Sequence, residues 1–413
     1  MKLITTNQTF WLTFSGLLRN AGVIVVLIVL ANTSGAASVS EYSLSLAITT
    51  PFFIFAQLGL KSLYLTKHAD HRQKTYLLVL GVALTFAFII SVAATSIFTP
   101  TLIIVVALVA FSKVIDSFSD LLTAPLQRAQ KAQFIAVVYG INALFCSVGV
   151  IVILTHSLNL VYALAWILLF SIFNMCALLI PVALHTTRKY LSHVESDPTN
   201  TRELLRVTHA GLPLGISTGL FALTASVPQY LLAHQGEIDA VGFLSILLYA
   251  FGLAELLVGS ASQSWIPEAR KYFTSPSLVK EFKKLLSKTV TKWTISLIPL
   301  FLVGIVSSWF VIPMVFANDY RMTIPITLPL IVSLFLLPNL QFGNIAILVA
   351  NLYSTEIILA LAALVIVLGT GFILIPIWGL PGALWSLTLS SLIRIFIGRF
   401  LLGLKVKNSY AKE

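Results

Sequence analysis

The feature that most constrains this chain is a succession of long apolar runs separated by short polar breaks. A helix that crosses the hydrocarbon core of a bilayer needs about 20 predominantly apolar residues. We expect such helices near residues 11–31, 41–61, 76–98, 101–123, 134–154, 159–184, 207–233, 238–261, 291–316, 323–349, 355–376 and 380–404. With 58% hydrophobic and 10% charged residues in a chain of 413, little sequence remains for a soluble domain. The sequence therefore predicts an all-α polytopic membrane protein with about twelve transmembrane helices.

Lysine and arginine residues gather on one side of this predicted topology. Of the 26 such residues, only Arg321 falls in a far-side loop, while Arg19, Lys113 and Arg394 fall inside predicted spans. Because cytoplasmic loops carry an excess of Lys and Arg, we expect both termini to be cytoplasmic. The formal net charge of +11 then serves as an orientation signal and a contact with anionic headgroups of the phospholipid bilayer, and it does not indicate nucleic acid as a partner.

The longest polar stretch in the middle of the chain follows the sixth predicted helix. We expect an N-lobe of helices 1–6 over residues 1–190, a cytoplasmic linker over 191–206, and a C-lobe of helices 7–12 over 207–413. Within the C-lobe, leucines and Phe282 alternate with lysines at helical spacing near 276–290. This pattern predicts a basic amphipathic helix on the cytoplasmic leaflet.

The two lobes resemble each other weakly in sequence. The separation between Ser15 and Tyr42 equals that between Gly215 and Gly242, and each lobe holds an even number of predicted helices. Such a repeat has its pseudo-twofold axis along the membrane normal, and two lobes around a central cavity favour transport by alternating access. An old duplication in a membrane protein that transports nothing is the alternative.

Charged side chains inside the predicted spans of the N-lobe are the most informative positions, because each costs about 2.5–3.5 kcal/mol near mid-bilayer unless it meets water or a partner. Arg19, with Asn20 beside it, is expected either to contact an anion in the cavity or to form a structural ion pair. Lys113, Asp116 and Asp120 share one helical face. They form either a polar strip on the cavity that holds a proton, or an internal pair of Lys113 with Asp116.

Glu255 stands alone in the eighth predicted helix. We consider it a proton or cation site, a partner of Arg19 across the interface between the lobes, or a packing residue. Arg394 in the last helix is expected to be structural. The sequence contains no paired-histidine metal motif, nucleotide-binding loop or nucleophile elbow, so we predict no catalytic residue, no metal and no cofactor, and a protein that is not an enzyme.

Three stretches resemble one family in their order and spacing. Residues 41–61 read EYSLSLAITTPFFIFAQLGLK, residues 124–131 read APLQRAQK, and residues 376–384 read PIWGLPGAL. They resemble helix two, the second cytoplasmic loop and the start of helix twelve of the bacterial O-antigen and polysaccharide flippases (Wzx-type) of the MOP exporter superfamily. Together they extend over the whole chain.

The resemblance implies transfer of an undecaprenyl-diphosphate-linked oligosaccharide, an O-antigen or capsule repeat unit, between leaflets of the bacterial inner membrane. It implies coupling to a proton or sodium gradient, a cavity lined by helices one, two, seven and eight, and other glycan-assembly membrane proteins as partners. Carried over, it makes Arg19, Asn20, Lys61 and Lys113 candidates for substrate binding and Glu255, Asp116 and Asp120 candidates for ion coupling.

Two other functions are weighed against this one. A multidrug or toxin exporter of the same superfamily binds cations and should carry an acidic residue in helix one, where this chain has Arg19 and no acid. A membrane polymerase or ligase of glycan assembly should have a large periplasmic loop, which the predicted topology lacks. Because Arg19 is the firmest basic residue expected in the cavity, the sequence favours a neutral glycan over a strongly acidic one.

Overall fold

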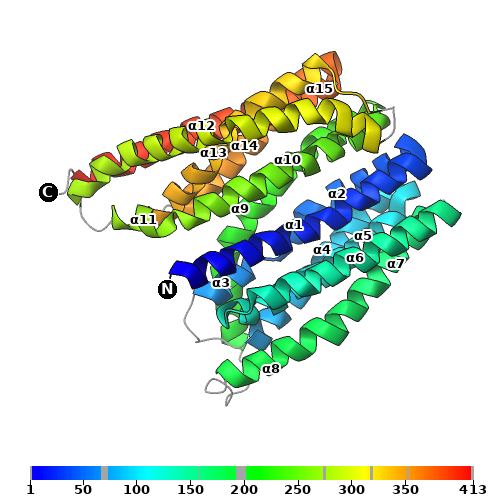
Figure 1. Cartoon of the computed structure of the whole chain (residues 1–413), viewed down its shortest axis with the longest axis horizontal. Helices are drawn as coiled ribbons and strands as arrows, with labels where there is room; N and C mark the ends of the chain where they lie inside the picture. Colours follow the sequence, from blue (N-terminus) through cyan, green and yellow to red (C-terminus); the bar gives the residue numbers. More distant parts are fainter. Residues whose placement is uncertain are drawn as a thin grey trace. The chain divides into compact units, whose positions relative to one another are not determined.

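The structure is a computed structural model, and it describes residues 2–66, 73–157, 159–191, 201–272, 276–316, 320–350 and 353–410. Every regular element in these ranges is helical (Figure 1). Twelve stretches of the described chain are long and apolar enough to cross a membrane: Phe10–Thr33, Gly35–Leu65, Gln73–Ile97, Pro100–Arg128, Ala132–Ser157, Leu160–Thr187, Thr201–His234, Ile238–Lys271, Lys284–Val315, Ile324–Val349, Thr355–Trp378 and Leu380–Leu404. The predicted all-α polytopic architecture is confirmed.

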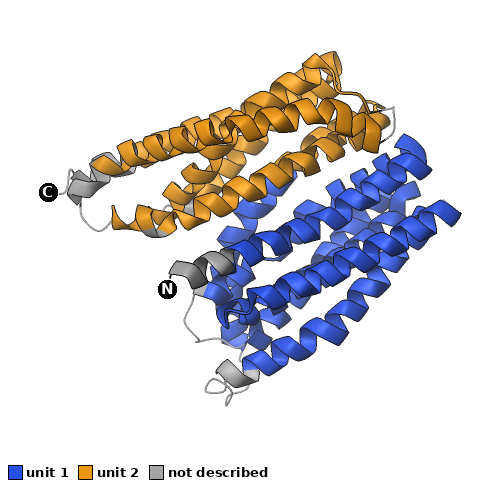
Figure 2. Ribbon diagram, viewed as in Figure 1, with its two compact units in different colours: residues 1–223 blue, residues 224–413 orange. Residues whose placement is uncertain are grey.

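The chain divides into two compact units, residues 1–223 and 224–413 (Figure 2). The division falls inside α9 (Thr201–His234) and not in the linker expected over 191–206, of which residues 192–200 lie outside the described chain. The reason is that the first half of the continuous helix α9 packs against unit 1. Each unit is described by itself below.

Unit 1 is built around α5 (Ile103–Arg128). Its other elements are α1 (Lys2–Thr33), α2 (Gly35–Ala56), α3 (Leu60–Thr66), α4 (Gln73–Phe98), η1 (Pro100–Leu102), α6 (Ala132–Ser157), α7 (Leu160–Asn174), η2 (Met175–Leu179) and α8 (Ile180–Leu191). The helix α5 contacts α2, α3, α4, α6, α7 and α8, while α1 packs along α6. The fourth span therefore places its side chains at the centre of the unit.

Unit 2, like unit 1 with α5, is built around one central helix, which we call the hub helix of the unit. It contains α10 (Ile238–Ser264), α11 (Ile266–Lys271), α12 (Pro276–Val315), α13 (Ile324–Val349), α14 (Tyr353–Trp378) and α15 (Leu380–Tyr410). Here α13, which forms the tenth span, contacts α10, α11, α12, α14 and α15. The second and the eighth spans of the chain also end in a break followed by a short helix, α3 after α2 and α11 after α10. Both correspondences are those expected of a six-helix repeat.

The break between α2 and α3 is held in place by a stripe of glycines on α9. Leu58 and Gly59 have positive φ angles of 48° and 57°, which end the first helix and redirect the chain. A Cβ atom on Gly211 would lie 2.6 Å from the backbone oxygen of Leu58, and one on Gly215 would lie 2.8 Å from that of Phe55. These glycines therefore permit a close approach of α9 to the break.

The segment near 276–290 differs from the surface helix expected there. It is the start of the 40-residue helix α12, which continues into the ninth span. Phe282 is fully buried and stacks on Trp265 with ring centroids 5.8 Å apart, and Trp265 also meets the ring of Phe342 at 5.6 Å. Because these aromatic rings offer protein contacts to its apolar face, the segment belongs to the core of unit 2.

Candidate functional site

The carboxylate of Asp120 lies at the centre of a charged cluster in unit 1. Lys61 of α3 donates a hydrogen bond to Asp120 Oδ1 at 2.9 Å, and a terminal nitrogen of Arg19 on α1 lies 3.6 Å from the same oxygen. Asp120 lies on α5, so one oxygen of the hub helix joins the first and second spans of the unit. The break after α2 brings Lys61 to this position, because α3 begins at Leu60.

A cavity of about 260 Å³ opens beside this cluster within unit 1. Its polar lining residues are Gln57, Lys61, Ser62, Ser117, Asp120 and Thr218. The amide nitrogen of Gln57, at the end of α2, donates to the hydroxyl oxygen of Ser117 on α5 at 3.0 Å. The cavity thus offers an ammonium group, hydroxyl groups and an amide to a polar ligand inside the membrane-spanning part of the chain.

A second cavity of about 110 Å³ lies among α1, α5, α6 and α7 of unit 1. Arg19, Lys113 and Asp116 line it together with Tyr139 and Asn142 of α6. Asp116 interacts electrostatically with both Arg19 and Lys113. The polar face predicted on α5 is therefore present, and it serves two cavities: Lys113 and Asp116 line this one, and Asp120 lines the other.

The charges of the cluster do not cancel. Arg19 and Lys61 carry two positive charges, and Asp120 carries one negative charge. The side chains of Arg19, Lys61 and Asp120 keep 38%, 30% and 26% of their surface exposed, so a ligand can reach them. A group of net charge +1, held on three helices and open to a cavity, is suited to binding an anion.

Asn20 stands apart from this cluster. It follows Arg19 on α1 but lines neither of the two unit 1 cavities in the described part of the chain. Its side chain is half-buried.

Glu255 of α10 finds its partner within unit 2. Its carboxylate accepts a hydrogen bond of 2.9 Å from the amide nitrogen of Gln341 on α13. Arg394 of α15 donates to the amide oxygen of Asn344 on α13 at 3.0 Å, and it interacts electrostatically with Glu255 and with Glu356 of α14. Glu255 and Arg19, which the sequence analysis considered as a pair, each have oppositely charged or amide partners in their own unit.

The sequence analysis did not single out the amides that hold these charges. Gln57, Asn142, Asn339, Gln341 and Asn344 lie in apolar spans and accept or donate to charged or hydroxyl groups, or line the cavities. An uncharged amide costs less to bury than a charge, so its presence in a span is a weaker signal than that of Arg19 or Glu255.

Among the described residues, no group of three or more His, Cys, Asp or Glu side chains could hold a metal ion. Cys146 is buried and Cys176 exposed, and both are free.

No family model matches the chain. Among solved structures, an outward-facing multidrug resistance MATE family transporter of the MOP superfamily aligns with a TM-score of 0.62 at 14% identity, over 98% of this chain and 97% of the other. A MOP superfamily transporter from Pyrococcus furiosus, described by the reverse polarity of its binding pocket, aligns with a TM-score of 0.56 at 13% identity, over 98% and 96%. The chain therefore has the fold of the MOP-superfamily transporters and is a multi-pass membrane protein.

One curated protein is similar to this chain in sequence. The chain is 23% identical over 386 residues to the capsular polysaccharide biosynthesis protein CapF of Staphylococcus aureus, covering 90% of this chain and 92% of CapF. The fold of the MOP-superfamily transporters, which the sequence led us to expect, is confirmed.

Proposed function

We propose that the protein is a flippase that moves an undecaprenyl-diphosphate-linked oligosaccharide from the cytoplasmic to the periplasmic leaflet of a bacterial inner membrane. It works by alternating access, with both termini in the cytoplasm. The cluster of Arg19 and Lys61 around Asp120 carries this proposal, because it is a cationic site on transmembrane helices with a cavity beside it. The similarity to a capsular polysaccharide biosynthesis protein supports a glycan as the cargo.

In this mechanism the cations replace the water that a diphosphate loses when it leaves the leaflet surface. An unpaired diphosphate cannot enter hydrocarbon, whereas an arginine fork and an ammonium group can bind its oxygens. Lys113 adds positive charge from the neighbouring cavity. The polyprenyl tail needs no polar site, since it can stay in the lipid throughout the step.

We propose that the carboxylates supply the coupling to a proton or sodium gradient. Asp120 accepts a hydrogen bond from Lys61 and lies close to Arg19. A bound diphosphate competes with Asp120 for both cations, so we propose Asp120 and the nearby Asp116 as the carboxylates that respond to the gradient in unit 1. Glu255, which has an amide partner and an exposed side chain, is the coupling candidate in unit 2.

A multidrug cation exporter is the second candidate, because transporters of that kind share the fold. Its substrate would meet the net positive charge of the unit 1 cluster and be repelled. The Pyrococcus furiosus transporter is a fold relative whose pocket is itself described as reversed in polarity. The sign of the charge in unit 1 thus favours an anionic substrate over a cationic drug.

Transport by purified protein in liposomes tests the proposal. The vesicles carry a fluorescent undecaprenyl-diphosphate-linked sugar, and a membrane-impermeant enzyme or quencher reports the fraction on the outer leaflet. The wild-type protein should equalise the two leaflets far faster than protein-free vesicles, and an undecaprenyl-linked sugar without the diphosphate should cross no faster than in empty vesicles. Equal rates with and without protein would contradict the flippase function.

A further inference from the structure

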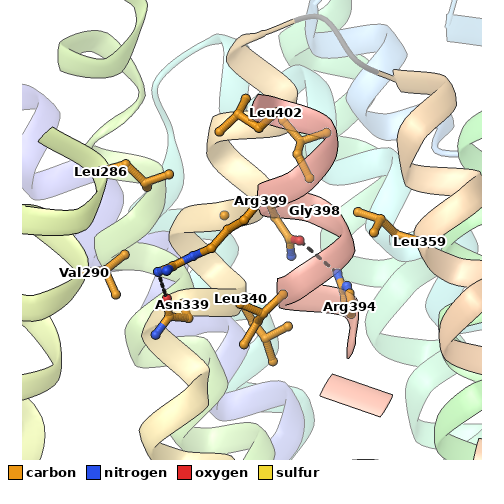
Figure 3. Close-up of a pocket in the computed structure, with 13 residues that line it drawn as sticks. Leu286, Val290, Asn339, Leu340, Leu359, Arg394, Gly398, Arg399 and Leu402 are labelled. Atoms are coloured by element: carbon orange, nitrogen blue, oxygen red, sulfur yellow. Dashed lines mark hydrogen bonds between the residues drawn. The ribbon is translucent and has the colours of Figure 1, made fainter. Parts of the chain in front are cut away.

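Two arginines of α15 face a small cavity in unit 2 that the proposed function does not use. The cavity has a volume of about 30 Å³ and lies among α12, α13, α14 and α15. Arg399 is hydrogen-bonded to the side-chain oxygen of Asn339, and Arg394 to that of Asn344, on opposite sides of the cavity (Figure 3). Both asparagines belong to α13, so the hub helix of the unit holds both guanidinium groups.

The two guanidinium groups differ in their charged surroundings. Arg394 interacts electrostatically with Glu255 and Glu356, so it has acidic neighbours inside the protein. Arg399 is exposed and bonded to a neutral amide, and no carboxylate lies within ion-pair distance of it in the part of the chain that the structure describes. A guanidinium group whose partner is an amide oxygen retains its charge for an anion.

The asparagines add hydrogen-bond donors to the same cavity. Each presents its amide oxygen to an arginine, which leaves its NH₂ group as a donor. Gly343 and Gly398 also line the cavity, and a Cβ atom on Gly343 would meet nothing within 4 Å. The walls are otherwise apolar, with Leu286 of α12 among them. Residues with hydrogen-bond donors on α13 and α15 therefore line a narrow space whose other walls are apolar.

The volume matches a small anionic group. One water molecule needs roughly 10–15 Å³ of such space. About 30 Å³ therefore holds roughly two water-sized atoms, as many as the two oxygens of a carboxylate. A carboxylate has two oxygens in one plane, and this plane matches the parallel N–H groups of a guanidinium fork.

We propose that this cavity of unit 2 binds the carboxylate of an acidic sugar carried by the glycan, with Arg399 as the contacting cation and Arg394 with Asn344 as positioning residues. The site is separate from the Arg19 and Lys61 cluster of unit 1, and it rests on the proposed function only for the source of the carboxylate. A neutral glycan was expected from the sequence because Arg19 was the one firm cation predicted in a cavity. Arg399 is a further cation at a cavity, where its guanidinium group is hydrogen-bonded to Asn339.

Binding of small probes to the purified full-length protein tests the site directly. Isothermal titration in detergent compares D-glucuronate, D-glucose and inorganic phosphate, which differ in the group under test. Glucuronate should bind saturably and at least about tenfold more tightly than glucose, a difference of ~1.4 kcal/mol. Phosphate can bind the Arg19 and Lys61 cluster of unit 1, so it should bind without displacing glucuronate. Equal binding of glucuronate and glucose, or displacement of glucuronate by phosphate, would overturn the proposal.

Variants of Arg399 then test whether glucuronate binds at this cavity. Arg399→Gln should reduce glucuronate affinity about tenfold, and Arg399→Lys should fall between it and the wild type, because lysine keeps the charge but loses the fork. Arg270→Gln, an exposed arginine on α11, is the matched control and should bind glucuronate as the wild type does. Because Arg399→Lys preserves the charge, it should keep the wild-type melting temperature even if Arg399→Gln does not fold. Unchanged glucuronate binding in Arg399→Lys and Arg399→Gln would place the carboxylate elsewhere and overturn the assignment.

Liposome transport separates this proposal from the flippase function. If the wild type moves lipid-linked glycans with and without a uronate, and Arg399→Gln slows only the uronate-bearing one, both proposals stand. Equal transport of both glycans by wild type and variant would overturn the carboxylate site and leave the flippase function intact. Transport of neither glycan by the wild type would overturn the flippase function, while the glucuronate titration would still decide the site.

Discussion

Lys61 Nζ lies 2.9 Å from Asp120 Oδ1, and the same carboxylate oxygen lies 3.6 Å from the guanidinium group of Arg19. One acidic oxygen on the hub helix of unit 1 is thus the shared counterion of two cations from different spans. Such an arrangement lowers the cost of two positive charges in a membrane segment. It also makes Asp120 the natural competitor of an anionic substrate.

Replacing that counterion should tighten anion binding. In Asp120→Asn, Arg19 and Lys61 lose a competing carboxylate, so inorganic pyrophosphate should bind the purified protein about tenfold more tightly, a gain of ~1.4 kcal/mol. The gain should shrink as salt is raised. Isothermal titration measures it, with Asp239→Asn, an exposed position in the first turn of α10, as the control. Weaker pyrophosphate binding in Asp120→Asn would show that Asp120 organises the cations and does not compete with the ligand.

Removing the guanidinium group of Arg19 should abolish export of the glycan. Arg19→Ala eliminates the only arginine that lines the 110 Å³ cavity of unit 1 in the described chain, and it leaves Asp120 with Lys61 alone. We expect loss of surface glycan in cells while the variant protein stays in the membrane at its normal level. Staining of surface glycan and immunoblotting of membranes measure both, and Lys74→Ala, an exposed position at the start of α4, serves as the control. Normal surface glycan in Arg19→Ala would remove this residue from the site.

Neutralising Glu255 should alter the dependence of transport on an ion gradient. Glu255→Gln keeps a partner for Gln341 but removes the titratable group. In liposomes with an imposed proton or sodium gradient, the wild type should be accelerated several-fold and the variant should run at its gradient-free rate. Glu268→Gln, an exposed carboxyl on α11, should respond as the wild type does. A variant that responds fully to both gradients would reduce Glu255 to a packing residue.

The glycine stripe on α9 should tolerate no added methyl group. Gly215→Ala would place a Cβ atom 2.8 Å from the Phe55 oxygen and 3.0 Å from the Leu58 Cα, so either the helix or the break must move. We expect a loss of roughly 1–3 kcal/mol of stability and a lower melting temperature in detergent. Gly369→Ala, where a Cβ atom would meet nothing within 4 Å, should melt at or above the wild-type temperature. Equal melting of the two variants would contradict the close packing of α9 on the break.

Truncating Phe282 decides between a core and a surface role for the start of α12. Its ring is fully buried against Trp265, so Phe282→Ala should cost roughly 3–5 kcal/mol and lower the melting temperature markedly. A residue that only anchored a helix to the leaflet would weaken membrane association of that segment and leave the melting temperature unchanged. Melting in detergent, where no bilayer is present, separates the two.

The sequence predicted those features that rest on repetitive local patterns. Span length and apolarity gave the twelve helices, and the i, i+3, i+4 spacing placed Lys113, Asp116 and Asp120 on one face of α5. The high cost of a charge in hydrocarbon marked Arg19 and Glu255 as positions that need polar surroundings, and the structure gives each of them polar neighbours.

The features that depend on tertiary contacts could not be predicted in the same way. The apolar face of residues 276–290 fits lipid or a protein core equally well, and only Trp265 and Phe342 determine which it meets. The break at Leu58 lies within a run that is apolar throughout, so no change of hydropathy marks it. The pairing of Lys61 with Asp120 depends on the packing of α3 against α5, which no local sequence pattern predicts.

The central claim is that the protein moves a lipid-linked glycan across the membrane, and the leaflet on which that glycan accumulates tests it most directly. Cells lacking the protein should trap undecaprenyl-diphosphate-linked repeat units on the cytoplasmic face, where a periplasmic glycosidase or label cannot reach them until the membrane is opened. Re-expression of the wild type should return them to the periplasmic face, and Arg19→Ala should not. Lipid-linked units that remain accessible from the periplasm in the deletion strain would contradict the account.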